Sequence, residues 1–162
     1  MDQAIIRPAR DDDLEKIREI AMAAWEPIYE SFRKMAGDEI FEGIHSQWRK
    51  EKADQVANHY KHYPETTLVT EYHGEVIGFI TYNLFHQKKL GVIGNNAIKP
   101  EFQSQGFGTK QYEKVLEIFR ENGMLFAEVT TGSYEAHAPA RTAYERVGFK
   151  PAVYSVRYYR KL

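Results

Sequence analysis

The stretch KPEFQSQGFGTKQYEKVLEIF, residues 99–119, changes character in its middle. A strand-like run stops at Pro100, the chain passes Gly106 and Gly108, and apolar residues then recur at helical spacing: Tyr112, Val115, Leu116 and Phe119. A glycine turn that leads from a strand into a helix presents unpaired backbone N–H groups in one place. Because such helix starts bind phosphate groups, the stretch predicts a strand, an anion-binding turn and a helix.

The chain before this stretch predicts one short strand and two helical regions. The strand covers residues 4–7, and apolar residues at helical spacing then predict a helix from Leu14 to about Trp25. Pro27 is expected to end or bend that helix. A second helical region is expected from Asp38 until a group of residues that includes Tyr60, Tyr63 and Pro64 closes it.

Strands are predicted on both sides of the opening stretch. Residues 67–72 and 75–84 flank the pair His73-Gly74, which reads as a hairpin turn. The second of these runs is almost continuously apolar, as expected of a central strand covered on both faces. A further strand over residues 90–98 runs directly into the glycine turn.

The carboxyl-terminal part predicts strand, helix and strand. Asn122-Gly123 is a helix stop, and residues 125–131 follow as a strand. Pro139 fits the first turn of another helix, which carries Tyr144 and ends at Gly148. Residues 153–160, VYSVRYYR, are predicted to form the last strand. The expected fold class is therefore α+β, that is, mixed α and β.

Composition limits the classes of function. The 162 residues fit one domain, 1–162, and their 43% apolar and 28% charged content is typical of a globular chain. With 22 basic and 23 acidic residues the formal net charge is -1, so we expect neither nucleic acid nor membrane as a partner. Zero cysteines exclude a disulfide, a thiolate metal site and a cysteine nucleophile. The first residues resemble neither a signal peptide nor a membrane span, so a cytoplasmic location is expected.

The two glycines alone allow a simple turn and helix cap. The motif lacks the third glycine and the acidic residue about 20 positions onward that a nicotinamide dinucleotide site requires. It also lacks the Gly-Lys-Ser/Thr ending of a nucleotide-triphosphate loop.

Two motifs together resemble the GCN5-related N-acetyltransferases. Their coenzyme loop has the pattern Gln/Arg-x-x-Gly-x-Gly/Ala, which Gln103, Gly106 and Gly108 match position by position. The segment AYERVGFKP, residues 143–151, resembles the Tyr-x-x-x-Gly-Phe ending of the family. The similarity lies mainly in residues 95–150, while the order of elements agrees along nearly the whole chain.

The resemblance implies a fold and an activity. The fold is a central, mostly antiparallel, twisted sheet of six to seven strands, splayed at the coenzyme site and flanked by about four helices. The activity is that of an acyltransferase: acetyl-CoA, as acyl-donor cosubstrate, acetylates a primary amine of a small molecule, peptide or protein by direct attack in a ternary complex.

The resemblance also implies the coenzyme-binding residues. Backbone groups of three strand residues are expected to bind the pantetheine arm, and these are Asn96, Ala97 and Ile98. The side chains of this trio are expected to matter less than their position. The pyrophosphate cradle is expected at Gln103, Ser104, Gln105, Gly106, Phe107, Gly108 and Thr109.

Two residues are the catalytic candidates. Tyr144 matches the tyrosine of the family that gives a proton to the coenzyme thiolate, and a phenol with a pKa of about 10 is protonated at neutral pH. Glu128 lies in the segment AEV, which resembles the Leu-Glu-Val of ribosomal-protein amino-terminal acetyltransferases, and is the candidate base. A glutamate pKa of about 4.3 is poorly matched to that task, so burial or a relaying water would have to help; a solvent-facing carboxylate is the alternative.

The chain departs from the family at two places. The link from Glu128 to Tyr144 is longer, with residues 132–135 as an inserted loop. His137 stands where the family has asparagine, so it is expected to replace that coenzyme contact, to assist as a base, or to be exposed before the helix, with exposure favoured.

The first helices of the family build the acceptor pocket, which points to Trp25, Glu26 and Tyr29 as substrate-binding residues. A carboxylate with aromatic rings suits a cationic amine, although Trp25 and Tyr29 also have the spacing of a packing pair. The six histidines show no ligand pattern, so no metal site is expected.

Three questions stay open at this point. A non-catalytic acyl-CoA-binding regulatory domain is the alternative to an enzyme, and an unrelated phosphate-binding fold is a third reading. The sequence does not name the amine acceptor. The aromatic segment 153–160 is also able to pair between two copies in a homodimer.

Overall fold

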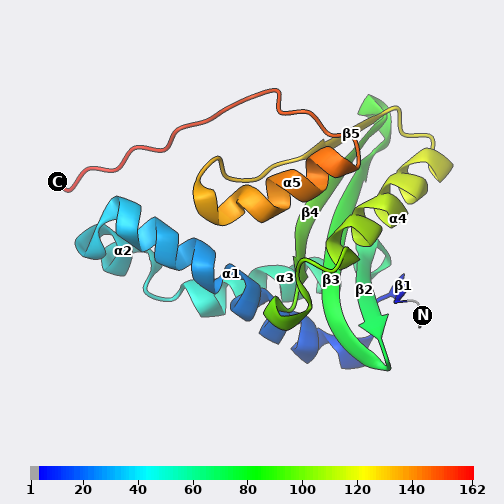
Figure 1. Ribbon diagram of the computed structural model, residues 1–162, viewed down its shortest axis with the longest axis horizontal. Coiled ribbons are helices and arrows are strands. Elements are labelled where there is room, and N and C mark those ends of the chain that lie inside the picture. The colour runs from blue at the N-terminus through cyan, green and yellow to red at the C-terminus, as the bar shows by residue number, and fades with distance from the viewer. Residues whose placement is uncertain (1–3) are drawn as a thin grey trace.

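The computed structural model describes residues 4–162 and shows one sheet with helices on both faces (Figure 1). Within these residues the sheet has five strands in the order β1-β2-β3-β4-β5. Neighbours are antiparallel from β1 to β4, whereas β5 is parallel to β4. The strands are β1 (Ile5–Pro8), β2 (Thr67–Tyr72), β3 (Glu75–Phe85), β4 (Leu90–Ile98) and β5 (Phe126–Val129).

Five α-helices accompany the sheet within the same residues. They are α1 (Leu14–Ala36), α2 (Asp38–His45), α3 (Trp48–His62), α4 (Phe107–Glu121) and α5 (Ala138–Arg146). Helices α1 and α3 cover one face of the sheet, and α4 and α5 cover the other (Figure 1). Across residues 4–162, no helix combines the length and the apolar character needed to span a membrane.

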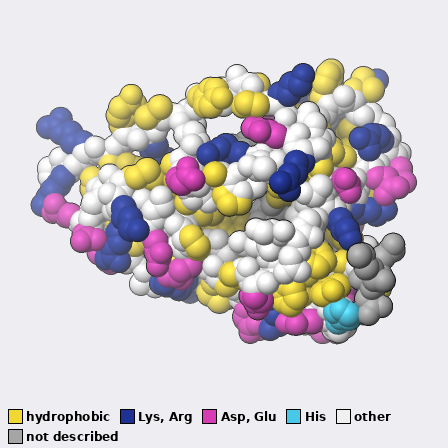
Figure 2. Space-filling view, viewed as in Figure 1, with side chains coloured by type: hydrophobic (Ala, Val, Ile, Leu, Met, Phe, Trp, Pro, Cys, Tyr) yellow, Lys and Arg dark blue, Asp and Glu magenta, His cyan; other side chains and the backbone are white. Residues whose placement is uncertain are grey.

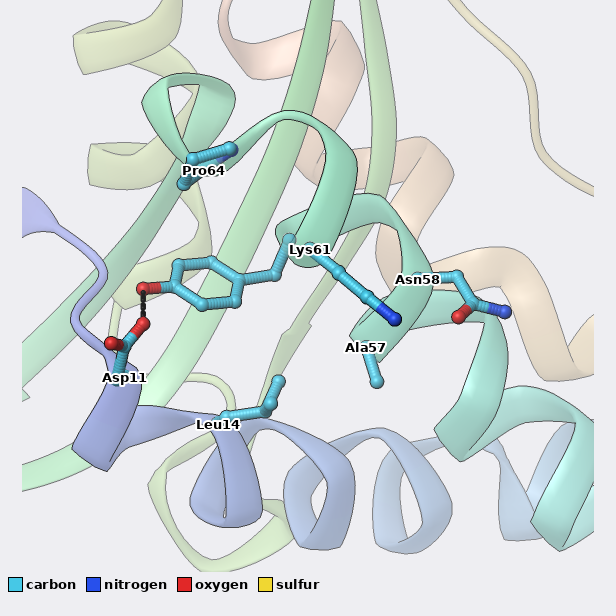
Figure 3. Close-up of a pocket in the computed structure, with 7 residues that line it drawn as sticks. Asp11, Leu14, Ala57, Asn58, Lys61 and Pro64 are labelled. Atoms are coloured by element: carbon cyan, nitrogen blue, oxygen red, sulfur yellow. Dashed lines mark hydrogen bonds between the residues drawn. The ribbon is translucent and has the colours of Figure 1, made fainter.

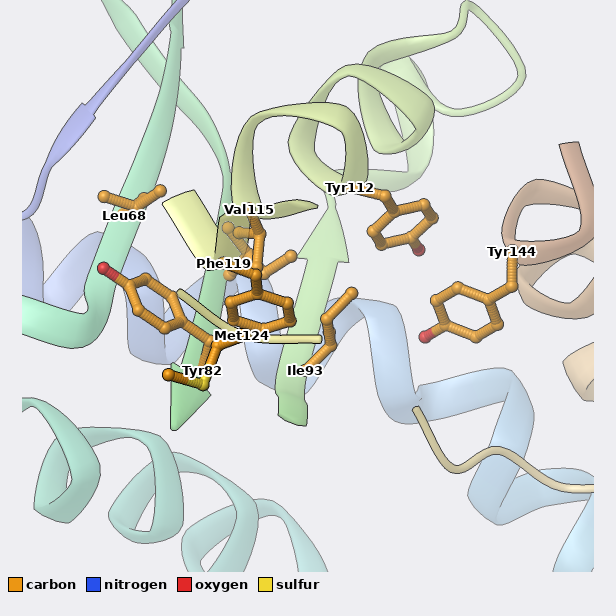
Figure 4. Close-up of a cluster of buried hydrophobic side chains, with 9 residues drawn as sticks. Leu68, Tyr82, Ile93, Tyr112, Val115, Phe119, Met124 and Tyr144 are labelled. Carbon is orange, nitrogen blue, oxygen red and sulfur yellow. The ribbon is translucent and has the colours of Figure 1, made fainter. Parts of the chain in front are cut away.

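The sheet separates two hydrophobic clusters. The cluster on the α4–α5 face includes Ile80, Val115 and Tyr144 (Figure 4). The cluster on the α1–α3 face includes Ile17 and Phe79. Because the neighbours Phe79 and Ile80 are both fully buried on opposite faces, the prediction of a central strand covered on both sides is confirmed.

A β-bulge in β4 decides which face its side chains reach. Ile80 pairs with Asn96 and Tyr82 pairs with Ile93, so two residues of β4, Gly94 and Asn95, lie opposite the single residue Thr81. An extra residue reverses the alternation of side chains, which turns Ile93 and Asn96 to the same face.

A Cβ on Gly94 would lie 2.6 Å from Thr81 Oγ1, so the bulge requires glycine there.

Strands β4 and β5 part after a short paired region. The last pair is Ile93 with Val129, and residues 94–98 have no partner on the β5 side. The predicted opening of the sheet beside the glycine turn is thereby confirmed. It leaves the backbone edge of β4 free next to the start of α4.

Many predicted elements agree closely with the structure, including the strands at 67–72 and 90–98 and the helix stop at Asn122-Gly123, which follows the end of α4 at Glu121. The predicted end of the first helix near Trp25 is wrong, because α1 continues past Pro27 to Ala36. A proline removes only one helical hydrogen bond, and beyond it Tyr29 and Phe32 pack on Phe41 of α2. The second helical region is broken at residues 46–47 into α2 and α3.

The predicted strand at 153–160 is also wrong, which accounts for five strands in place of six to seven. After α5 the chain runs as an extended, unpaired segment toward α2, with Val153 90% and Tyr158 88% exposed (Figure 1). The ring of Tyr159 contacts Phe32 at 5.7 Å, so the segment is held by side chains of the helices and not by a neighbouring strand. Figure 2 shows apolar side chains along it and a hollow beneath it.

Candidate active site

The start of α4 leaves several backbone donors unused. Gly106 caps the helix in the left-handed region, with φ 85°, which glycine adopts without strain. The first backbone hydrogen bond of the helix runs from Lys110 N to Gly106 O at 3.1 Å. The N–H groups of Phe107, Gly108 and Thr109 therefore point out of the helix start, where the helix dipole favours an anion.

The space in front of these donors is open. A Cβ on Gly106 would meet no protein atom within 4 Å, and one on Gly108 would meet only Tyr112 Oη at 3.8 Å. Gly108 has an ordinary helical conformation, and glycine costs a helix about 0.5–1 kcal/mol relative to alanine. Since no protein atom requires glycine at position 108, a group that approaches from outside explains it. The residues present thus fit the pyrophosphate of a coenzyme.

Side chains of the loop hold its shape. Gln103 Nε2 donates to Ile98 O at 3.0 Å, which ties the loop to the end of β4, and Gln105 Nε2 donates to Glu101 O at 3.3 Å. Phe107 is buried with Ile98. The expected cradle therefore offers its backbone outward, while the side chains of Gln103 and Phe107 attach the loop to the end of β4.

Other predicted coenzyme residues lie along the free edge of β4 and in the loop. Ala97 and Ile98 are only 8% and 7% exposed, so their side chains belong to the core. Ser104 has φ 62°, a left-handed conformation unusual for serine, which shapes the turn before Gly106. Thr109 is half-buried in the first turn of α4.

Tyr144 lies in a hydrogen-bonded network on the α4–α5 face. Asn96 Nδ2 donates to Tyr144 Oη at 3.0 Å, and Tyr112 Oη donates to Asn96 Oδ1 at 2.8 Å. The two tyrosine rings lie 4.7 Å apart, one from α4 and one from α5 (Figure 4). The β4 bulge places Asn96 between them, so three elements converge on one phenol.

The environment keeps Tyr144 protonated. Burial raises the pKa of this phenol, while its hydrogen bonds with Asn96 and Tyr112 act in the opposite direction. Burial also raises the pKa of Tyr112. Because both phenols hold their protons at neutral pH, Tyr144 is a donor that an anionic leaving group beside β4 can use.

Sequence reasoning missed the side chains of Asn96 and Tyr112. The resemblance implies that the Asn96 side chain matters less than its position, yet this side chain contacts two tyrosines. The sequence pattern places Tyr112 only on an apolar helix face. A tyrosine on a buried face needs a partner for its hydroxyl, and that requirement was the available signal.

On the opposite face of β4, a lysine is buried next to Asn95. Lys52 of α3 is 9% exposed, and its Nζ donates to Asn95 Oδ1 at 3.2 Å and to Gln55 Oε1 at 2.6 Å. The same Nζ lies 4.4 Å from the centre of the Trp25 ring. Burial lowers the pKa of Lys52 to about 8. This lysine was not among the predicted site residues.

The predicted acceptor residues divide between two places. Trp25 of α1 faces Lys52 beside β4.

The other two predicted acceptor residues lie elsewhere. Tyr29 stacks on Trp48 with ring centres 4.3 Å apart, and Glu26 forms an ion pair with Arg49. A cavity of about 320 Å³ is lined by Glu26, Glu30, Arg33, Phe41, Glu42, Ser46, Trp48 and Arg49. Of the three predicted residues, the structure thus places Trp25 beside Lys52, which contacts Asn95 of β4.

Glu128 lies in the paired region of β4 and β5. It is exposed and lies opposite Val92, before the point where the two strands part. Asn96, in contrast, lies beyond the last β4–β5 pair. Contact between Glu128 and an incoming amine therefore stays a prediction.

His137 is half-buried, which differs from the favoured expectation of exposure. Its Nδ1 lies 3.0 Å from Thr131 Oγ1 and its Nε2 lies 3.0 Å from Tyr134 Oη. A Cβ on Gly132 would lie 2.3 Å from its ring, so the inserted loop is built around this histidine. Burial lowers the pKa of His137. Both ring nitrogens have local partners, and its contact with a coenzyme stays a prediction.

A second cavity, of about 330 Å³, lies away from this network (Figure 3). It lies between the start of α1 and the end of α3, where Tyr60 Oη donates to Asp11 Oδ1 at 2.7 Å. None of its lining residues belongs to β4, α4 or α5. The cavity is therefore separate from the Tyr144 site.

Solved structures share this fold. PaiA N-acetyltransferase of Thermoplasma acidophilum, in complex with coenzyme A, superposes with a TM-score of 0.70 at 19% identity over 91% of this chain and 90% of that chain. A GNAT family acetyltransferase of Brucella melitensis, in complex with acetyl-CoA, gives a TM-score of 0.62 at 22% identity over 93% and 85% of the two chains.

Sequence comparison points the same way. The chain is 36% identical to an uncharacterised N-acetyltransferase of Archaeoglobus fulgidus over 70 residues. These residues make up 40% of this chain and 48% of that relative. The match thus spans about half the length of the curated relative. The model of the acetyltransferase (GNAT) family matches residues 14–149, which include the coenzyme loop and Tyr144, and the chain therefore belongs to that family.

Proposed function

We propose that this chain, as a single domain, is an N-acetyltransferase that moves the acetyl group of acetyl-CoA to a primary amine of a small molecule, peptide or protein. The observation that carries the proposal is the convergence of three features at the free edge of β4. They are the open helix start at Gly106, the hydrogen-bonded phenol of Tyr144, and the aromatic ring of Trp25 on the opposite face.

The donor half rests on backbone groups. The N–H groups that follow Gly106 face open space and suit a pyrophosphate. The unpaired edge of β4 offers further backbone groups to an extended pantetheine arm. When bound there, the coenzyme supplies an activated thioester.

Tyr144 acts on the leaving group. Its pKa is raised by burial, so the phenol carries a proton throughout the neutral range. Asn96 orients the hydroxyl from one side, and the bulge fixes Asn96. Tyr144 gives its proton to the thiolate as the carbon–sulfur bond breaks.

The acceptor amine attacks as a free base. An amine with a pKa of about 10.4 is charged at pH 7, and its neutralisation costs about 4.6 kcal/mol. We assign this proton to Glu128 through a relaying water, because Glu128 is open to solvent and lies one residue before the end of the β4–β5 pairing. Trp25, Glu26 and Tyr29 are the proposed contacts of the acceptor, since a carboxylate and aromatic rings attract a cation.

The test is coenzyme-thiol release across a panel of primary amines and peptides. Tyr144→Phe should bind acetyl-CoA as the parent chain does and lose most turnover, about 100-fold or more. Tyr154→Phe, at an exposed tyrosine of the carboxyl-terminal segment, is the matched control and should keep full activity. Full turnover in Tyr144→Phe would remove Tyr144 as the acid. Binding of acetyl-CoA without release on any acceptor would favour a regulatory acyl-CoA-binding domain.

A further inference from the structure

A lysine side chain of the protein itself lies beside β4, on the face opposite Tyr144. Lys52 extends from α3 to β4, with its Nζ over the Trp25 ring and 3.2 Å from Oδ1 of Asn95, a residue in the part of β4 that β5 does not pair. These are the contacts that would recognise an incoming alkylammonium group: an aromatic face and amide oxygens. Lys52 therefore occupies the surroundings expected of an acceptor.

Asn95 and Asn96 show how close the two faces lie. They are consecutive residues of β4, and their side chains reach opposite faces of the sheet. Asn95 contacts Lys52 on the α1–α3 face, and Asn96 contacts Tyr144 on the α4–α5 face. A thioester at the unpaired edge of this strand would lie between an amine on one side and a proton donor on the other.

We infer that Lys52 is a self-acetylation site, whose amine accepts the acetyl group from acetyl-CoA bound at the free edge of β4 when no other acceptor is present. The inference rests on the proposed function, because the thioester must lie beside residues 94–98. It adds a modification site to that function.

The step balances without a further reagent. The neutral Nζ of Lys52 attacks the thioester carbonyl carbon, so that a C–N bond forms and the C–S bond breaks. The nitrogen loses one proton to water, the thiolate takes one from Tyr144, and the phenolate recovers a proton from water. The products are acetyl-lysine and the free thiol.

The surroundings of Lys52 favour this step. The groups that face its Nζ are uncharged: Trp25 from α1, Gln55 from α3 and Asn95 from β4. Burial lowers the pKa of Lys52 to about 8, so a substantial fraction is neutral and nucleophilic near neutral pH. Acetylation removes the charge whose burial is unfavourable, which favours the product.

The experiment incubates the full chain with acetyl-CoA alone and follows acetylation of individual lysines by peptide mass spectrometry. Lys50 and Lys61 lie on the same helix and are exposed, so they report direct chemical acetylation. Lys52 should be modified at least about ten times faster than either, because it is held beside the donor. Its rate should rise with pH up to about 8 and level off above it, where the amine is mostly neutral.

Three controls decide the outcome. Gly108→Leu, which blocks the coenzyme loop, should reduce the rate at Lys52 at least about ten-fold, and unfolding in urea should bring it to the rate of Lys50 and Lys61. An acceptor that is turned over should slow the modification. Equal rates at the three lysines, or an unchanged rate in Gly108→Leu, would overturn the inference. If acetyl-CoA stabilises the chain and an added amine is acetylated while Lys52 is not, only this inference fails; without acetyl-CoA binding, the proposed function fails as well.

Discussion

The amide of Asn96 donates to the hydroxyl of Tyr144 across 3.0 Å, from a strand position that the β4 bulge has turned toward α5. The phenol is 48 residues away in the chain, and the geometry depends on both elements. The orientation of Tyr144, the proposed acid, thus depends on the bulge in β4 as well as on α5. The bulge in turn depends on Gly94, which lies against Thr81.

Asn96→Ala should therefore reduce turnover and leave acetyl-CoA affinity nearly unchanged. Loss of the amide frees the phenol from its orientation, and we expect a decrease in kcat of about 10- to 100-fold, which is less than the loss of the acid itself. Tyr112→Phe, which removes the other hydroxyl but not the ring packing, should have a smaller effect. Steady-state thiol release measures both variants, and an Asn96→Ala variant with the kcat of the parent chain would contradict the proposed positioning role.

Gly108→Leu tests the coenzyme loop without disturbing the fold. The nearest protein atom to a Cβ at this position is 3.8 Å away, and leucine is a better helix former than glycine, so stability should stay equal or rise slightly. The side chain would fill the space in front of the helix start, and the dissociation constant for acetyl-CoA should rise at least about ten-fold. Calorimetric titration measures the affinity, and thermal unfolding measures the stability.

Glu113→Leu, at an exposed position of the same helix, is the control for that substitution. It should leave coenzyme affinity unchanged. Equal affinities of Gly108→Leu and the parent chain would show that the pyrophosphate binds elsewhere.

Local signals explain which parts of the fold could be predicted. The strand at 67–72, the hairpin at His73-Gly74 and the start of α4 each depend on residues close together in the chain, and the structure confirms them. The course of α1 beyond Pro27 depends on aromatic packing with α2. The conformation of residues 153–160 depends on which part of the chain they contact. Neither is visible in a local pattern.

The same distinction holds for the site. Tyr144 and Gly106 were predicted because each belongs to a short motif. The environment of Lys52 depends on Asn95, 43 residues away. The orientation of Asn96 depends on a bulge, of which Gly94 inside the strand is only a weak sign. The lowered pKa of Lys52 and the orientation of Asn96 arise from contacts between residues far apart in the chain, so a short sequence motif does not predict them.

Lys52→Met should stabilise the protein at neutral pH. Burial lowers the pKa of Lys52 to about 8, against about 10.4 in an unfolded chain. Between these values the unfolded chain binds more protons, so the free energy of unfolding of the parent rises with pH there, and below about 8 the cost of the buried charge is fully present. We expect a gain on the order of 2 kcal/mol at pH 7 that shrinks from pH 8 upward.

Urea unfolding at several pH values measures this gain. Lys61→Met, at an exposed position of the same helix, should change stability by less than about 0.5 kcal/mol at any of them. A Lys52→Met gain that is absent, or that does not vary with pH, would show that the lysine carries no cost of burial.

Asp13→Asn should destabilise the fold in a pH-dependent way. Arg7 donates two hydrogen bonds to the buried Asp13, at 2.7 and 3.0 Å, and these bonds lower the pKa of the carboxyl group. A lowered pKa adds stability that is present above the unfolded value of about 3.9 and is lost as the pH falls through the folded value. The variant should lose about 2 kcal/mol at pH 7, and the difference should shrink below about pH 4.

Asp12→Asn, at the exposed neighbour, is the control for this ion pair and should be nearly neutral at both pH values. Chemical unfolding at pH 7 and pH 3 makes the comparison. If Asp13→Asn cost the same at both, the hydrogen bonds of the ionised carboxylate would not be the source of the stability.

Hydrogen exchange tests the carboxyl-terminal segment and the expected homodimer together. Residues 153–160 are extended and unpaired, and the outer edge of β5 has no neighbouring strand within residues 4–162. The backbone amides of residues 153–160 should exchange far faster than those of β3, which is hydrogen-bonded to a strand on each side. Protection that grows with protein concentration would show that two copies pair through this segment, as the sequence pattern allows. Protection equal to that of β3 at every concentration would instead place the segment in the sheet of its own chain.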